Sequence, residues 1–141
     1  MPEIEALQTT LAAEHAAVYV YGLLGSRTSQ TGEASLYQAL RAAYDAHRER
    51  RDTLVGEIAA LGAVPVASAA AYTPPPGLDT TEGRYAAALA LEQGCASTYA
   101  ALVGETTGAR RLEAIGLLND AAARELTFRG APESFPGYAE R

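Results

Sequence analysis

The sequence predicts an all-α fold, a four-helix bundle in which one long crossover joins the second and third helices. Apolar residues recur at steps of three and four over four segments, which is the spacing of a helix face that packs on a core. The 141-residue chain is rich in alanine, lacks Trp and has few β-branched runs, a composition that favours helix over sheet. A proline-containing stretch near the middle separates the helices into two pairs.

The first helix is expected over residues 2–25. Glu3 and Glu5 complement the positive end of its dipole. The face expected to pack on the core comprises Ile4, Leu7, Leu11, Glu14, Val18 and Tyr21. A glutamate on a buried face is costly unless another group pairs with it, so Glu14 is the first candidate functional residue.

The second helix is expected over residues 33–61, after a polar turn at 25–32 that makes it an antiparallel neighbour of the first. Its core face comprises Leu36, Leu40, Ala43 or Tyr44, His47, Arg50 or Arg51, Leu54, Ile58 and Leu61. An ionisable residue, His47, again stands in the middle of an apolar face.

The crossover is expected over about residues 62–79, GAVPVASAAAYTPPPGLD, where four prolines and two glycines exclude a helix. Extended at about 3.3 Å per residue, it reaches on the order of 55 Å. The second helix is roughly 43 Å long at 1.5 Å per residue. The crossover can therefore run the whole length of the bundle, so that the third helix runs parallel to the second.

The third and fourth helices are expected over residues 80–105 and 109–129, with Asp79 and Glu82 at capping-box spacing. Their core faces comprise Tyr85, Leu89, Glu92, Cys95 or Ala96, Tyr99 and Leu102 in the third, and Leu112, Ile115, Asn119, Ala122 and Leu126 in the fourth. A tail of about residues 130–141 carries Phe135 and Tyr138, and either folds back on the bundle or frays. One domain spans residues 1–141.

Three of the polar residues on these faces are expected to meet at the midplane of the bundle. Glu14 precedes the centre of the first turn by about as many residues as His47 follows it, so equal rise per residue places them at one height. Glu92 lies near the middle of the third helix, and a crossover that spans the bundle places it at that height too.

A four-helix bundle with one long crossover is the ferritin-like arrangement, whose two-metal site takes a Glu from each of two helices and a Glu-x-x-His pair from each of the others. Glu14 and Glu92 match the single glutamates. His47 matches a histidine of a pair, but Tyr44 stands at the glutamate position. The fourth helix has Asn119 and Ala122 where its pair is expected, so three of the six ligands remain.

Four segments carry a resemblance to a more specific family: AAEHAAVYVYG at 12–22, AHRERRD at 46–52, ALEQ around Glu92, and FRGAPESFPG at 128–137. In their order and spacing, over nearly the whole chain, the sequence resembles the actinobacterial ferritin-like domains of unknown function named DUF4439. This resemblance implies a ferritin-like fold and no established activity.

The polar centre has two interpretations. As a metal site, Glu14, His47 and Glu92 would suit Fe, Mn or Zn in a metal-binding, oxidoreductase-like protein. As a structural network, a charged His47 would pair with both glutamates, with Arg51 as a further counter-charge and with hydroxyls supplied by Tyr21, Tyr44, Tyr85 and Tyr99. The missing ligands favour the second interpretation, a degenerate metal-site remnant in a protein with a structural or association role.

Two further residues could have a functional role, and each also has a purely structural interpretation. Cys95, one turn from Glu92, is either a thiolate ligand or, as its type favours, a small buried thiol. His15 lies one step off the core face, which favours an interface or surface histidine. No Ser-His-Asp or Cys-His arrangement is found, so no catalytic residue is assigned.

The composition also limits which partners and which cellular compartment are expected. A net charge of −6 and a pI of about 4.9 argue against nucleic-acid binding. No apolar run is long enough to span a membrane, and no signal peptide is recognised, so a cytoplasmic protein is expected, with a trimmed secreted protein as the alternative. The small residues Ala12, Ala13 and Ala16 would allow a second copy to approach closely, which predicts a homodimer.

Overall fold

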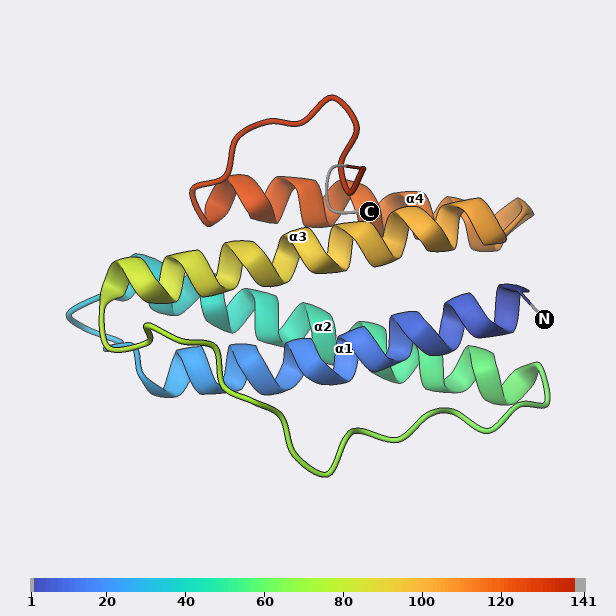
Figure 1. Cartoon of the computed structure of the whole chain (residues 1–141), viewed down its shortest axis with the longest axis horizontal. Helices are drawn as coiled ribbons and strands as arrows, with labels where there is room; N and C mark the ends of the chain where they lie inside the picture. The colour runs from blue at the N-terminus through green and yellow to red at the C-terminus, as the bar shows by residue number, and fades with distance from the viewer. Residues whose placement is uncertain (1, 139–141) are drawn as a thin grey trace.

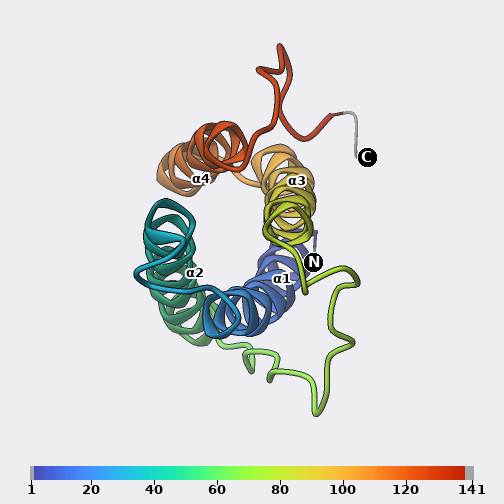
Figure 2. The same ribbon diagram turned by 90° about the vertical axis from the view of Figure 1, so that its left-hand side faces the viewer.

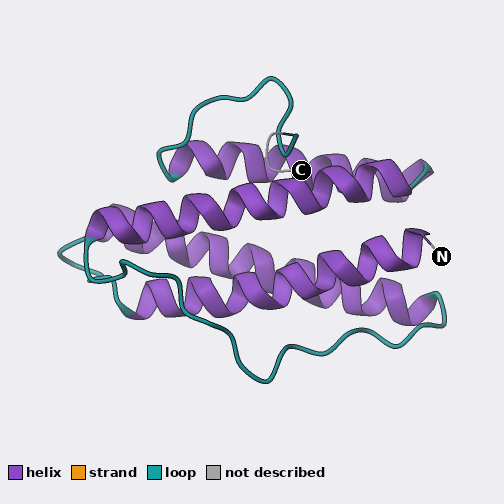
Figure 3. Ribbon diagram, in the orientation of Figure 1, coloured by secondary structure: helices purple, strands orange, loops and turns teal. Residues whose placement is uncertain are grey.

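The computed structural model describes residues 2–138, which form four helices joined by loops (Figure 1). The helices are α1 (Pro2–Ser26), α2 (Ala34–Ala60), α3 (Thr81–Glu105) and α4 (Gly108–Thr127). No strand occurs within residues 2–138 (Figure 3). The all-α four-helix bundle predicted from the sequence is confirmed, and each helix boundary lies within two residues of its predicted place. Met1 and the last three residues of the predicted tail lie outside the described residues.

The crossover between α2 and α3 runs back along the bundle, as its length predicts. α1 is antiparallel to α2, and α3 begins at the end where α2 begins, so α2 and α3 run parallel (Figure 1). α1 packs on α2 and on α3, and α3 packs on α4. Viewed end-on, the four helices form a ring in which α2 and α4 face each other across the least closely packed side (Figure 2).

The apolar core consists of two clusters, one on each side of the bundle midplane. The larger cluster includes Tyr21, Leu24, Leu40, Tyr99 and Phe128. The smaller cluster comprises Leu7, Leu11, Leu54, Ile58, Leu102 and Ala114. These residues confirm most of the core faces predicted for the first three helices, although Leu61, at the end of α2, is exposed. The midplane between the clusters holds the polar residues described below.

The predicted core face of α4 is wrong. Leu112, Ile115 and Leu126 are 71%, 37% and 48% exposed, whereas the fully buried positions are Ala114, Ala121 and Glu125. Both sides of α4 carry apolar residues at helical spacing. The three exposed residues lie on one side, whereas Leu117 and Leu118 pack on the core. Spacing alone therefore did not decide which side turns inward. The small residues Ala114 and Ala121 let α4 approach α3, while Leu112, Ile115 and Leu126 remain outside.

The crossover is held against α1 by polar contacts. The Gln8 amide donates to the Val64 carbonyl at 2.7 Å and accepts from the Val66 N–H at 2.8 Å. A ring nitrogen of His15 lies 3.0 Å from the Val66 carbonyl, so His15 contacts the chain's own crossover. These contacts replace the backbone pairing that an extended segment otherwise lacks.

The start of α3 differs in detail from the sequence prediction. Thr80 rather than Asp79 is the N-cap, and its hydroxyl accepts from the Gly83 N–H at 3.0 Å. A side chain at Gly83 would place its Cβ 1.7 Å from the Gly77 carbonyl oxygen, so the close approach of the crossover to α3 requires glycine.

The described part of the tail turns back over α3. Arg129 adopts a left-handed conformation with φ of 72°, and the Gly130 N–H donates to the Glu125 carbonyl at 2.7 Å, which ends α4. Gly137 approaches the α3 backbone so closely that a Cβ there would lie 2.4 Å from the Ala96 carbonyl oxygen. Phe135, next to this contact in sequence, is exposed.

Candidate functional site

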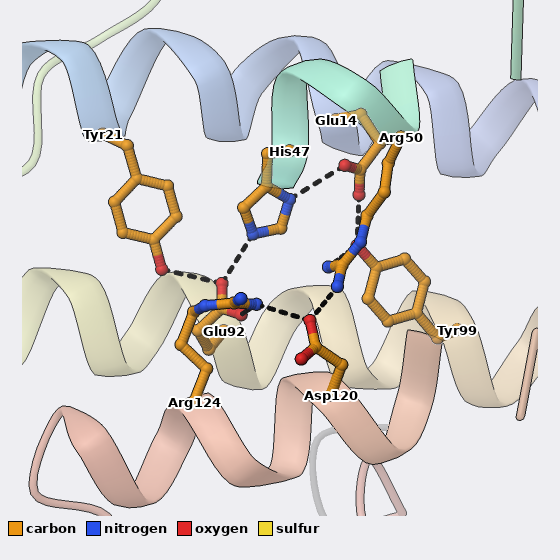
Figure 4. Close-up of polar contacts among 8 residues, drawn as sticks. All are labelled: Glu14, Tyr21, His47, Arg50, Glu92, Tyr99, Asp120 and Arg124. Atoms are coloured by element: carbon orange, nitrogen blue, oxygen red, sulfur yellow. Dashed lines mark hydrogen bonds and ion pairs between the residues drawn. The ribbon is translucent and has the colours of Figure 1, made fainter. Parts of the chain in front are cut away.

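The structure brings Glu14, His47 and Glu92 together at the midplane, from α1, α2 and α3 (Figure 4). All three side chains are fully buried. His47 Nδ1 lies 2.8 Å from Glu14 Oε2, and its Nε2 lies 2.8 Å from Glu92 Oε2. The imidazole therefore bridges two carboxylates that come from different helices.

Two tyrosines complete the inner contacts of the glutamates. The Tyr21 hydroxyl donates to Glu92 Oε2 at 2.7 Å, and the Tyr99 hydroxyl donates to Glu14 Oε1. The Tyr21 ring also stacks on the His47 ring, with centroids 5.3 Å apart. The other two tyrosines considered from the sequence lie elsewhere: Tyr44 beneath the Arg48 guanidinium, and Tyr85 beneath that of Arg129.

α4 and the second half of α2 supply the outer layer of the site. Arg124 donates to Glu92 Oε1 at 3.2 Å and to Asp120 Oδ2 at 2.9 Å. Arg50 donates to the Tyr99 hydroxyl at 3.2 Å and also to Asp120 (Figure 4). We call these eight residues the midplane network: Glu14, Tyr21, His47, Arg50, Glu92, Tyr99, Asp120 and Arg124.

Sequence reasoning identified only part of this network. Arg51, expected as the counter-charge, instead pairs with Asp52 at 3.0 Å. Asn119, expected at the ligand position of α4, is exposed, and the helix contributes its neighbour Asp120. Arg124 was missed because it lies outside the predicted apolar face of α4. The sequence offered one sign of its role: Arg124 is a charged residue that follows three alanines in the same turn of the helix.

The charges of the network cancel when His47 is protonated. Both ring nitrogens face a carboxyl oxygen at hydrogen-bond distance. Ionised carboxylates only accept, so when both glutamates are ionised each ring nitrogen must carry a hydrogen. The imidazolium and the two arginines then balance the three carboxylates, Glu14, Glu92 and Asp120. This pairing satisfies the condition under which buried charges are tolerated.

The electrostatics agree with this protonation state. Burial opposes a charge on the imidazole, but the hydrogen bonds and charges of Glu14 and Glu92 outweigh it and raise the pKa of His47. Burial likewise opposes a charge on Glu92, yet the hydrogen bond and charge of His47, together with Tyr21 and Arg124, lower the pKa of Glu92. Each group holds its partner in the charged form.

Cys95 adds a possible third ligand. Its sulfur, a carboxylate oxygen of Glu14 and a ring nitrogen of His47 all lie within 4.8 Å of one another, so this buried group could hold a metal ion. Glu92 is outside that group. Burial, and then the charges of Glu92 and Glu14, raise the pKa of Cys95 well above its usual value, which keeps the thiol protonated.

The donor set fits a metal only after rearrangement. A metal needs a lone pair on His47, but both nitrogens face carboxylates, so one of these hydrogen bonds would have to break. It would also need the Cys95 thiolate, whose formation burial opposes. As it stands, the arrangement joins α1, α2 and α3 through the hydrogen bonds of His47 to Glu14 and Glu92.

The helices of the described chain are also too short or too polar to cross a membrane.

Comparison with known proteins gives a family and a fold. Residues 6–140 match the family described as "Domain of unknown function (DUF4439)". A crystal structure of a conserved hypothetical protein, rv2844, from Mycobacterium tuberculosis superposes with a TM-score of 0.82 at 26% sequence identity, and the match covers 91% of this chain and 95% of that chain. No curated protein matches the chain. Because the family match spans nearly all of the sequence, this chain belongs to the DUF4439 family.

Proposed function

We propose that the midplane network is a structural remnant of a metal site and that the protein acts through association, without redox chemistry. One observation carries the proposal. Every carboxylate oxygen of Glu14 and Glu92, and both nitrogens of His47, already has a hydrogen-bond partner inside the network. An imidazole that donates from both nitrogens has no lone pair for an ion, and each carboxylate oxygen would have to share or give up its hydrogen bond to bind one.

The role of such a network is to specify the arrangement of the helices. Buried ion pairs add little net stability compared with apolar residues, but they exclude alternative registers because a shifted partner leaves a charge unpaired. Here His47 joins α2 to α1 and α3, and Arg124 joins α4 to α3. The network thus fixes the relative heights of all four helices.

The association proposal rests on the outer α4 face, which we define by Leu112, Ile115 and Leu126. These large apolar side chains are exposed on one side of a single helix. A second copy is the proposed partner, because the face is self-complementary about Asn119. In an antiparallel pair, Leu112 stands opposite Leu126 of the copy, and Ile115 stands opposite the small, exposed Ala123. The alanine face of α1 remains the alternative, since Ala12 is exposed.

Metal analysis tests the first half of the proposal. Protein purified without chelators or an immobilised-metal column should contain no stoichiometric iron, manganese or zinc, and should take up none on reconstitution. A Glu14→Gln variant provides the comparison, because it alters one ligand while keeping the shape of the side chain. Near-stoichiometric metal in the wild type, lost in Glu14→Gln, would contradict the proposal.

Sedimentation velocity tests the second half. The wild type should show a concentration-dependent dimer, and Leu112→Glu should sediment as a monomer. Val64→Glu is the matched control, since Val64 is an exposed apolar residue on the crossover, away from α4. A wild type that stays monomeric at millimolar concentration, or equal behaviour of the two variants, would contradict association through the outer α4 face.

A second candidate function is metal binding by Glu14, His47 and Cys95, favoured by the closeness of their ligand atoms. Carboxylate, imidazole and thiolate together suit zinc. Cobalt(II) is a suitable probe, because ligation by the thiolate produces a sulfur-to-cobalt absorption band. Cys95→Ser should abolish that band under this alternative. If the wild type shows no such band, the alternative fails.

A further inference from the structure

A cleft of about 300 Å³ opens between α2 and α4. It exists because these two helices close the ring without packing on each other as their neighbours do. Its interior is apolar and receives leucines from all four helices: Leu7, Leu54, Leu102 and Leu117. The volume is at the lower end of the range for small-molecule sites, which are mostly apolar with a few convergent polar groups.

Two of the polar residues that line this cleft are glutamates on opposite walls. Glu57 comes from α2 and Glu113 from α4. Burial, and then the hydrogen bond and charge of Glu113, raise the pKa of Glu57 to about 7. Two facing carboxyls that share one proton behave in this way, because like charges at close range resist ionising together.

The cations near this pair are already engaged. Arg110 faces the pair from α4, but its guanidinium is bound to Glu3 of α1. Arg50 lines the inner end of the cleft and is bound to Tyr99 and Asp120. Glu49 on α2 adds a further negative charge to the lining, and α3 contributes only Leu102. The cleft therefore combines buried leucines with three more exposed glutamates, and its two arginines are bound to other acidic groups.

We propose that the cleft binds a small amphipathic cation, an ammonium group on a short hydrocarbon chain, with the ammonium between Glu57 and Glu113 and the hydrocarbon on the leucines. The ammonium adds a positive charge to that of Arg110, which is itself bound to Glu3, and it donates to both carboxyls. A divalent metal fits less well, because calcium takes about six to eight oxygen ligands and the floor of the cleft offers none. This site is separate from the midplane glutamates and goes beyond the proposed function.

Calorimetric titration with n-hexylammonium tests the proposal. At pH 8 we expect saturable binding with one ligand per chain. The affinity should fall by about thirtyfold at pH 5.5, since the shared proton, with its pKa of about 7, competes for the same position. n-Hexanol, which has the chain without the charge, should bind at least tenfold more weakly.

Two variants locate the site. Glu57→Gln and Glu113→Gln should each weaken hexylammonium binding at least tenfold, while the control Glu82→Gln, at an exposed position near the start of α3, should leave it unchanged. Thermal melts would establish that each variant is folded. The proposal is overturned if wild type and Glu113→Gln bind equally, if hexanol binds as well as hexylammonium, or if no saturation occurs below about 10 mM. Calcium binding tighter than hexylammonium would also overturn it.

Discussion

The midplane network and the α2–α4 cleft each contain two glutamates from different helices, but they place different groups between them. At the midplane, His47 lies between Glu14 and Glu92 and contacts both at 2.8 Å. In the cleft, Glu57 and Glu113 face each other directly. The pKa of Glu92 is lowered although its side chain is fully buried, whereas the pKa of the less buried Glu57 is raised to about 7.

The comparison shows that the group beside a carboxyl decides whether burial prevails. At Glu92 the hydrogen bond and charge of His47, with Tyr21 and Arg124, outweigh burial and lower the pKa. At Glu57 burial is the largest cause of the raised pKa, and the facing Glu113 adds to it. At the midplane, each carboxylate oxygen and ring nitrogen of Glu14, His47 and Glu92 has a hydrogen-bond partner, whereas in the cleft two carboxyls face each other, which is the basis of the proposed cation binding.

The largest expected effect is on the midplane side. His47→Ala should lower the free energy of unfolding by about 3–5 kcal/mol, because it removes the cation between two fully buried glutamates and leaves Arg124 as the charged partner of Glu92 alone. Urea denaturation at pH 7 measures the change. The control is His15→Ala, whose partner is a carbonyl of the partly exposed crossover, and which should cost about 1 kcal/mol or less. Similar losses in the two variants would show that His47 does not balance the glutamates.

The same network should respond to pH. Because the pKa of His47 is raised in the folded state, its contribution to stability is complete below its unfolded value near 6.5 and is lost as pH rises through the folded pKa. The free energy of unfolding should therefore fall from pH 7 towards pH 10. Glu57, with its pKa of about 7, still titrates near pH 7 but contributes little slope above about pH 8. His47→Ala should make this slope smaller. It should not remove the slope entirely, because the raised pKa of Cys95 also lowers the stability as the unfolded thiol ionises above about pH 8.5. An equal slope in the variant would assign the whole dependence to other groups.

A smaller effect is expected where the network crosses to α4. Asp120→Asn should cost about 1 kcal/mol, because Asp120 accepts from both Arg50 and Arg124 but is partly exposed, so solvent screens the loss. Asp45→Asn is the matched control, since its ion pair with Arg41 is exposed and 3.8 Å long. Chemical denaturation of both variants at low ionic strength makes the comparison. A loss no larger than that of the control would separate Asp120 from the network.

The smallest effect is in the cleft, and it has the opposite sign. Glu113→Gln should raise the free energy of unfolding at pH 8 by about 0.5 kcal/mol, after allowance for solvent screening, by removing one of two facing charges. At pH 5 the wild-type pair holds its proton, so the gain should vanish. Melting temperatures at the two pH values check this. Destabilisation at pH 8 would mean that Glu113 is held by a cation instead.

The sequence alone determined the four helices, the long crossover and the meeting of Glu14, His47 and Glu92. These features follow from the 3.6-residue period, from the prolines of the crossover and from equal rise per residue along antiparallel helices. Each of these features depends on neighbouring residues or on a sum of equal steps along the chain, so it can be predicted without knowing how the helices pack.

Only the tertiary structure decided which side of α4 faces inward and which charges complete the midplane network. Both sides of α4 carry apolar residues, and the choice between them depends on how closely Ala114 and Ala121 can approach the other helices. That choice turns Asp120 and Arg124 towards Glu92 and Arg50, and leaves Leu112 and Leu126 outside. It also creates the α2–α4 cleft. Rotation of a helix about its own axis is set by contacts between elements distant in sequence, which spacing within one helix does not encode.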